Sequence, residues 1–217
     1  MMTKRGRFIV VEGLEGAGKS TAIQTIKHYL QDFVPDILLT REPGGTRIGE
    51  AVRHLIKEKV ENETLDPRSE LLLLYAARVQ LIEQVIRPAL DSGCWVLADR
   101  FEWSTFAYQG GGRGLEREMI TKLSTFCLEN FKPDLIIYLD LSPEQGLARV
   151  KKRGASDRIE QESLAFFTQI RNTYLQLIQT TANAISIDAS QALETVQQLI
   201  KTQLKSFLLN NAIAKTI

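Results

Sequence analysis

The sequence predicts an α/β protein in which helices cover both faces of a five-stranded parallel sheet, a three-layer α/β/α sandwich. Short apolar runs alternate along the chain with longer segments whose apolar residues recur at helical spacing. The short runs are continuous rather than interrupted by polar residues, which is typical of strands buried on both faces. The predicted strands cover residues 8–11, 37–39, 95–98, 135–139 and 185–187.

The segments between these strands predict the helices in chain order. Apolar residues recur at helical spacing over residues 22–33, between the first and second strands. A second helical pattern runs through Val52, Leu55 and Ile56. Both patterns have the spacing of three to four residues that places apolar side chains on one side of a helix.

Further helices are predicted in the second half of the chain. A long helix is expected over residues 69–91, with Gly93 as its stop. Ser142 has the features of an N-cap, because a proline follows it and Gln145 is placed to close a capping box. The last helix is expected to follow the fifth strand and to end near Leu209.

Length and composition indicate one ordinary globular domain over residues 1–217, with 44% apolar and 24% charged residues. The formal net charge of +1 provides no overall field that would attract nucleic acid or membrane, so neither is expected as a partner. No apolar stretch reaches 18 residues. We therefore expect a cytoplasmic protein.

The chain has two cysteines, Cys94 in a strand-like run and Cys127 in a helix-like run. Two cysteines in such apolar surroundings are predicted to be buried free thiols in a reducing compartment.

The stretch GLEGAGKS, residues 13–20, fits the phosphate-loop pattern G-x-x-x-x-G-K-[ST] between a strand and a helix. Its glycines allow successive N–H groups to turn inward, the Lys19 ammonium reaches the β and γ phosphates, and the Ser20 hydroxyl can bind Mg²⁺. The loop predicts ATP binding but does not say where the phosphate goes. The predicted phosphate-binding residues are Gly13, Leu14, Glu15, Gly16, Ala17, Gly18, Lys19 and Ser20.

Other motifs narrow the class of phosphate-loop protein. The guanine-binding Asn-Lys-x-Asp and the Asp-x-x-Gly of switch GTPases are absent from the sequence. Asp140 is followed by Leu141 rather than by a second acidic residue, which weakens the case for a motor-type ATPase. A small phosphotransferase remains, and it needs a second anion pocket.

Arginines near the ends of the predicted strands indicate such a pocket. Arg100 follows the third strand, Arg41 and Arg53 flank "REPGGT", and Arg78 lies in an apolar part of the long helix. Each one alone is more typical of a solvated surface charge. Together they predict an acceptor phosphate and base site at the carboxyl edge of the sheet, where open α/β sheets bind ligands.

A third group of cations lies in "ARVKKRGASDRIE", which includes Arg149, Arg153 and Arg158. It is either a solvated charged face or a lid over residues 149–160 that neutralises charge on the transferred phosphoryl group. The lid is favoured because the phosphate loop has no arginine.

The segments "EGLEGAGKS", "TREPGGT", "YAARVQ", "DRFEWSTFAYQGGGRG", "PDLIIYLDL" and "RGASDRIEQE" occur in that order. In this the chain resembles the bacterial thymidylate kinases from Phe8 to about Leu204. The resemblance implies a nucleoside monophosphate kinase fold with a short mobile lid, ATP-dependent phosphorylation of dTMP to dTDP, Mg²⁺ and a homodimer. The alternatives are a kinase of another pyrimidine nucleotide or nucleoside, and a nucleotide-binding regulator that is no kinase.

The resemblance also implies roles for single residues. Lys19, Arg100, Arg153 and Glu15 would be catalytic, Arg149 would lie near the adenine, and Ser20 and Asp99 would hold the metal, with Glu160 a weaker candidate. Leu74 stands where the family often has a phenylalanine stacked on thymine, and Phe101 where it often has Tyr or His. The implied dTMP site consists of Glu42, Pro43, Arg53, Leu74, Arg78, Arg100, Ser104, Thr105, Tyr108 and Gln109.

The monophosphate oxygen is itself the attacking group, so no general base is required, and His28 and His54 are expected to be structural or exposed. Glu15 is an anion in a loop built for anions. It either orders the acceptor side of the cleft or is a solvated loop residue.

Overall fold

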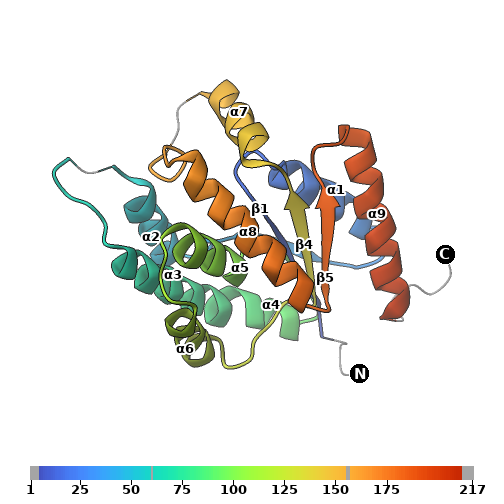
Figure 1. Ribbon diagram of the computed structural model, residues 1–217. Helices are drawn as coiled ribbons and strands as arrows, with labels where there is room; N and C mark the ends of the chain where they lie inside the picture. Colours follow the sequence, from blue (N-terminus) through green and yellow to red (C-terminus); the bar gives the residue numbers. More distant parts are fainter. Residues whose placement is uncertain (1–4, 60, 155–156, 212–217) are drawn as a thin grey trace.

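The computed structural model describes residues 5–59, 61–154 and 157–211. It confirms the predicted α/β fold: five strands form one parallel sheet in the order β2-β3-β1-β4-β5, with helices on both faces (Figure 1). The strands are β1 (Phe8–Gly13), β2 (Ile37–Arg41), β3 (Trp95–Asp99), β4 (Leu135–Asp140) and β5 (Ala184–Asp188). The helices are α1 (Lys19–Leu30), α2 (Arg47–Lys57), α3 (Pro67–Leu81), η1 (Ile82–Ile86), α4 (Arg87–Asp91), α5 (Glu102–Thr105), η2 (Phe106–Gly112), α6 (Arg117–Leu128), α7 (Pro143–Arg153), α8 (Leu164–Thr180) and α9 (Leu193–Asn210).

The register of the sheet brings the ends of three strands together. β1 is central, and Val11 pairs with Asp99 of β3 while Gly13 pairs with Leu139 of β4. The phosphate loop after β1 therefore lies beside the residues that follow β3 and β4. In Figure 1 the arrows of β4 and β5 point towards α7, which marks this carboxyl edge.

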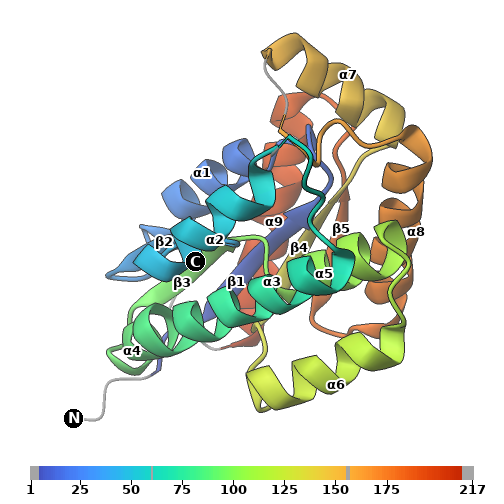
Figure 2. The same ribbon diagram turned by 90° about the vertical axis from the view of Figure 1, so that its left-hand side faces the viewer.

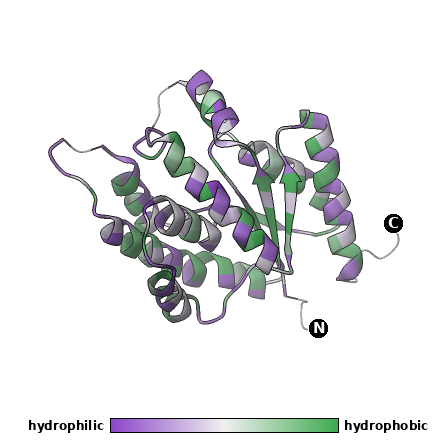
Figure 3. Cartoon of the chain, viewed as in Figure 1, coloured by the Kyte–Doolittle hydropathy of each residue, from purple (hydrophilic) through white to green (hydrophobic). Residues whose placement is uncertain are grey.

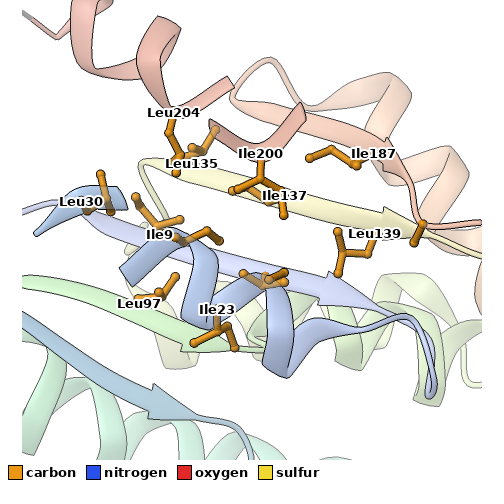
Figure 4. Packing of buried hydrophobic residues seen from close by; sticks show 14 of the residues in the cluster. Ile9, Ile23, Leu30, Leu97, Leu135, Ile137, Leu139, Ile187, Ile200 and Leu204 are labelled. Atoms are coloured by element: carbon orange, nitrogen blue, oxygen red, sulfur yellow. The ribbon is translucent and has the colours of Figure 1, made fainter. Parts of the chain in front are cut away.

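Apolar side chains hold both layers of helices to the sheet. On one face α1 and α9 pack on β1, β3 and β4, where Ile23 and Ile200 meet Ile9 and Ile137 (Figure 4). On the other face η1 and α4 cover Phe8 of β1, and α8 covers Tyr138 of β4. Figure 3 shows hydrophobic residues along β4 and β5 and mixed hydropathy on the covering helices, as a sheet covered on both faces requires.

The long helix predicted over residues 69–91 is present, but it starts earlier and is not uniform. It begins at Pro67 because the Asp66 side chain caps it, accepting a hydrogen bond from the Arg68 N–H at 2.9 Å. A π-helical segment, η1, separates α3 from α4, and the three run on as one rod in Figure 2.

Three smaller expectations need correction. Leu55 is exposed, because α2 turns Val52 and Ile56 towards the core. Cys94 precedes β3 rather than lying in it, since its N–H closes a turn on the Ala89 carbonyl at 2.9 Å. Cys94 and Cys127 are free thiols as expected, but both are half-buried rather than buried.

Apart from the helix-like run around Cys127, the region after β3 was not predicted from the sequence, and neither was the helix before β5. α5, η2 and α6 follow β3 directly, and α8 contributes Phe166, Phe167, Ile170 and Tyr174 to the core. Ser142 does cap α7, because its side-chain oxygen accepts a hydrogen bond from the Gln145 N–H. This is one of the two hydrogen bonds of the predicted capping box.

None of the helices in the described part of the chain combines the length and apolar content that crossing a bilayer requires. The cytoplasmic location stays a prediction.

Candidate active site

A cleft of about 460 Å³ opens at the carboxyl edge of the sheet. Its walls come from the phosphate loop, from α2 and α3, from the end of β3 with α5 and η2, and from α7 with residues 157–160. The structure thus brings the predicted donor and acceptor residues to one space. The predicted site residues that line it are Glu15, Gly16, Gly18, Lys19, Ser20, Glu42, Pro43, Arg53, Leu74, Arg78, Asp99, Arg100, Ser104, Thr105, Tyr108, Gln109, Arg149 and Glu160.

The phosphate loop joins β1 to α1 through two glycines in the left-handed region. Gly16 has a φ of 74° and Gly18, the N-cap of α1, has a φ of 89°. A side chain is disfavoured at both positions. At Gly16 it would also lie 2.4 Å from the Gly146 carbonyl oxygen of α7, so the loop packs closely against that helix.

Lys19 begins α1, and its ammonium folds back on the loop. Its Nζ donates hydrogen bonds to the carbonyl oxygens of Gly13 at 3.1 Å and Leu14 at 2.9 Å. Burial lowers the pKa of Lys19 to about 8. The ammonium is therefore held in place in the cleft, and its charged form is stabilised when an anion binds beside it.

The remaining loop members anchor the loop. Gly13, Leu14 and Ala17 are buried, Leu14 against Trp103 and Ala17 within the core under α1. These three contribute backbone and packing rather than side chains that face the cleft.

Glu15 is turned towards Arg100 and Tyr108 and is only 15% exposed. Its Oε1 accepts a hydrogen bond from Arg100 Nη2 at 2.7 Å, and its Oε2 accepts one from the Tyr108 hydroxyl at 2.6 Å. Burial by itself raises the pKa of Glu15, but the charges of Arg100 and Lys19 outweigh it, and the pKa is lowered. Glu15 is therefore not a solvated loop residue, which was one of the two alternatives that its sequence position left open.

Arg100 lies directly after β3 and is held by three elements. Its φ of 70° is unusual for a residue with a side chain, and such strain is concentrated at functional sites. Its Nη1 donates to the Ser104 hydroxyl at 3.2 Å and the Tyr174 hydroxyl at 3.3 Å, and its guanidinium lies 4.9 Å from the centre of the Tyr108 ring.

A second buried arginine forms the far wall. Arg78 of α3 is 2% exposed, its Nε donates to Glu42 Oε2 at 2.7 Å, and its Nη2 donates to Thr105 Oγ1 at 2.9 Å. Burial disfavours its charge, but Glu42 more than offsets this and raises the pKa of Arg78. Its Nη1 has no hydrogen-bond partner among the residues that the structure describes. One donor of a fixed cation is therefore left for a ligand.

This cleft can be compared with known proteins. A family model described as "Thymidylate kinase" matches residues 11–200, which include the phosphate loop and every wall of the cleft. The chain belongs to the thymidylate kinase family. Two curated proteins named "Thymidylate kinase", from Legionella pneumophila strains Corby and Paris, are each 54% identical to it over 211 residues. Each alignment covers 97% of this chain and the whole length of the relative.

Two further predicted residues of this thymidylate kinase family chain are held by backbone oxygens. Arg53 Nη1 donates to the Pro43 carbonyl at 3.0 Å, which ties α2 to the "REPGGT" loop. Arg149 of α7 donates to the carbonyl oxygens of Gly16 and Ala189, both at 3.2 Å. Arg149 therefore lies on the phosphate-loop side of the cleft.

The segment after α7 lies on α2 and closes one end of the cleft. Asp157 pairs with Lys57 Nζ at 2.7 Å, and Arg158 Nε donates to the Ile56 carbonyl at 2.8 Å. Arg153 is the last residue of α7, and its side chain lies outside the described part of the chain, as do residues 155 and 156.

Sequence analysis missed two buried carboxylates. Glu12 at the end of β1 is fully buried and accepts hydrogen bonds from the Phe101 N–H at 2.9 Å, the Ser104 hydroxyl at 2.7 Å and the Tyr174 hydroxyl at 2.9 Å. Glu70 of α3 is also buried and contacts Gln109. Each adjoins an apolar run in the sequence, Glu12 after residues 8–11 and Glu70 before residues 71–75, and this position next to buried residues was the signal available for both.

Proposed function

We propose that this chain transfers the γ-phosphoryl group of ATP to the phosphate of dTMP, giving ADP and dTDP. The observation that supports this most strongly is that two cations, Lys19 and Arg100, line one cleft and both act on the charge of Glu15. One cation serves the donor and the other the acceptor. Family membership agrees with this assignment.

ATP takes the side of the cleft formed by the phosphate loop. The N–H groups of residues 13–20 and the positive end of α1 hold its phosphates, and Lys19 reaches the β and γ groups. Arg149 lies on the same side, next to Gly16, towards the nucleoside of ATP.

The acceptor phosphate pairs with Arg100, and its base lies on the wall formed by Arg78 and Gln109. Among the buried polar atoms that have no partner within the described residues, this wall holds a donor, Arg78 Nη1, and an acceptor, Gln109 Oε1; Glu42 Oε1, beside Arg78, is a further acceptor. Thymine offers the complementary pair, O4 and N3–H, whereas cytosine offers the reverse pair, an amino group and an unprotonated N3. Leu74 packs on the base without ring stacking, a loss of about 1 kcal/mol relative to an aromatic side chain.

The pocket has other walls from the predicted set. Pro43 and Arg53 close it from the "REPGGT" side, and Ser104 and Tyr108 close it from α5 and η2. We assign to Tyr108 the exclusion of a ribose 2′-hydroxyl, which the family resemblance implies; the hydrogen bond from its hydroxyl to Glu15 at 2.6 Å holds the ring in place.

The reaction needs alignment and charge compensation rather than a base. The second pKa of a phosphate monoester is ~6, so the attacking oxygen is largely unprotonated at neutral pH. Lys19 fixes the donor phosphates and Arg100 fixes the acceptor phosphate. We assign to Arg153 the task of neutralising the negative charge that shifts between donor and acceptor during the transfer. Such an arginine is worth about 10³-fold or more in rate.

The residues present fit a magnesium ion beside the donor phosphates. Asp99 Oδ1 is buried at the end of β3 and has no hydrogen-bond partner within the described residues, and Ser20 lines the same cleft. No group of three or more metal-binding side chains occurs in that part of the chain. This suits Mg²⁺, which takes one or two protein oxygens and completes its shell with phosphate and water. When bound, the ion neutralises charge on the phosphates. Glu160 is a weaker candidate for a ligand of the metal.

We further propose one domain over residues 1–217 whose lid, residues 149–160, closes over the phosphates. Gly154 separates α7 from the docked segment that starts at Asp157 and gives the lid a flexible joint.

We also propose a homodimer. α3 and α6 pack on each other, and they carry three of the exposed large apolar side chains, Leu72, Met119 and Phe126. Phe126 is 81% exposed. Exposed apolar residues gathered on neighbouring helices are typical of a surface that a second subunit covers.

An acceptor panel tests the function. ADP release from ATP is measured with dTMP, dUMP, dCMP, UMP and thymidine, using Lys19→Ala as the inactive control. We expect dTMP to be used with the highest kcat/KM. A preference for another pyrimidine would indicate a kinase of that nucleotide or nucleoside. A rate of ADP release that does not depend on any acceptor would indicate a nucleotide-binding regulator that is no kinase.

A further inference from the structure

Glu70 is a buried carboxylate surrounded by groups that donate hydrogen bonds. It is 1% exposed and lies in the first turn of α3. Its Oε1 accepts a hydrogen bond from Gln109 Nε2 at 2.6 Å and lies 3.6 Å from Arg113 Nε. Its Oε2 accepts a hydrogen bond from the Arg158 guanidinium. One carboxylate thus joins α3, the helix η2 and the segment after α7.

These contacts fix the hydrogen-bonding role of Glu70. Two guanidinium groups, which can only donate, flank its carboxylate, so both of its oxygens serve as acceptors. The Gln109 side chain must therefore turn its NH₂ group towards Glu70, and its oxygen must face the other way.

The oxygen of the Gln109 amide is the atom left without a partner among the described residues. Gln109 lines the cleft and is 3% exposed, and its Oε1 has no hydrogen-bond partner anywhere in residues 5–59, 61–154 and 157–211. Arg78, whose Nη1 is also unpartnered within those residues, lines the same cleft. A buried acceptor without a partner costs free energy that a ligand N–H recovers.

We propose that Glu70 is a positioning residue that sets base specificity: it locks the Gln109 amide so that the oxygen accepts the N3–H of a keto pyrimidine and repels the lone pair on N3 of cytosine. The inference rests on the proposed function. An amide alone cannot discriminate, because turning it over exchanges donor and acceptor at the same size and shape. The carboxylate behind it removes that freedom.

The test replaces Glu70 by a group that can both donate and accept. Glu70→Gln allows either orientation of the Gln109 amide, so the preference for dTMP over dCMP, measured as the ratio of dissociation constants by calorimetry, falls at least about tenfold. The matched control is Glu162→Gln. Glu162 Oε1 accepts a hydrogen bond from Arg113 Nη1 at 2.5 Å in the same cluster, and no described contact joins it to Gln109. There the ratio stays within about twofold.

A purely structural role for Glu70 predicts another result. Loosening the whole wall would weaken both nucleotides alike and leave the ratio unchanged, and this outcome overturns the proposal. Wild-type protein that fails to phosphorylate dTMP overturns the proposed function instead, so the two failures are distinct.

A measurement on the wild-type protein covers the case in which Glu70→Gln does not fold. The side-chain NH₂ signals of Gln109, assigned by their loss in Gln109→Leu, are followed by NMR during dTMP addition. An NH₂ held by the carboxylate exchanges slowly with water and stays protected when dTMP binds. Fast exchange in the free protein, or an NH₂ that leaves Glu70 when dTMP binds, contradicts the proposal.

Discussion

Glu15 Oε1 lies 2.7 Å from Arg100 Nη2, so a residue of the phosphate loop holds the arginine to which we assign the acceptor phosphate. The two residues are 85 positions apart in the chain and are brought together at the carboxyl edge of the sheet. The phosphate loop and Arg100 therefore form one preorganised unit, in which a carboxylate fixes the position of a cation in the cleft.

Glu15→Gln should weaken the acceptor side. It keeps the shape of the side chain but replaces a charge-assisted hydrogen bond, worth about 1.5–3 kcal/mol, by a neutral one. We expect kcat/KM for dTMP to fall about 10- to 100-fold while the KM for ATP changes little, measured by steady-state kinetics with each substrate varied. The control is Glu83→Gln, which breaks an exposed pair with Arg87 remote from the cleft. Unchanged kcat and KM for dTMP in Glu15→Gln would show that the pair has no role in acceptor binding.

The pH dependence should report Lys19. Burial lowers its pKa to about 8 in the free protein, and only the protonated ammonium below that pH attracts phosphate. Above pH ~8, kcat/KM for ATP should fall about tenfold per pH unit, whereas kcat should hold to higher pH because bound phosphates favour the charged form. Lys19→Arg keeps the charge and should remove this inflection. A decline that persists in Lys19→Arg would assign the pKa to another group.

Asp99→Asn should raise the Mg²⁺ requirement. The substitution removes the negative charge at the buried Oδ1 but keeps the shape of the side chain, so Mg²⁺ binds more weakly. The Mg²⁺ concentration for half-maximal activity should therefore rise at least about tenfold. Titration of activity with MgCl₂ at fixed ATP and dTMP measures this. Asp134→Asn, at an ion pair with Arg7, is the control for loss of a strand-end carboxylate. Equal Mg²⁺ curves for wild type and Asp99→Asn would remove Asp99 from the metal site.

The dimer should depend on Phe126. Phe126→Asp places a charge in the proposed apolar interface, where an unpaired buried charge is strongly unfavourable. Sedimentation velocity should then report the 24.5 kDa chain alone. Leu193→Asp changes a side chain on α9 that is also exposed and should leave the dimer intact. A wild-type protein that sediments as a monomer at all concentrations would refute the proposed assembly.

Two alanine substitutions should separate strain from steric overlap in the phosphate loop. Gly16 and Gly18 both have positive φ, and this costs an alanine about 1–2 kcal/mol at each. Only at Gly16 would the new methyl group overlap the Gly146 carbonyl, since nothing lies within 4 Å at Gly18. The free energy of unfolding in urea should therefore fall by about 1–3 kcal/mol more for Gly16→Ala than for Gly18→Ala. Equal losses would mean that α7 moves aside freely.

The sequence by itself determined the features that short stretches of chain encode. Five apolar runs predicted the strands, and the strand–loop–helix context of residues 13–20 predicted the phosphate loop, because local geometry is set by neighbouring residues. Arg100 was placed at the site because chemistry-bearing residues after parallel strands share one edge, and Arg78 because an arginine in an apolar part of a helix can be a buried ligand binder.

Only the tertiary structure decided how the charges are paired. Glu12 and Tyr174 are 162 positions apart, yet their side chains hydrogen-bond in the interior. Glu70 reaches Gln109 and Arg158 from two other parts of the chain. No local pattern encodes such contacts, since a buried carboxylate is tolerated only when distant segments deliver its hydrogen-bond donors, and the folded chain alone brings them within reach.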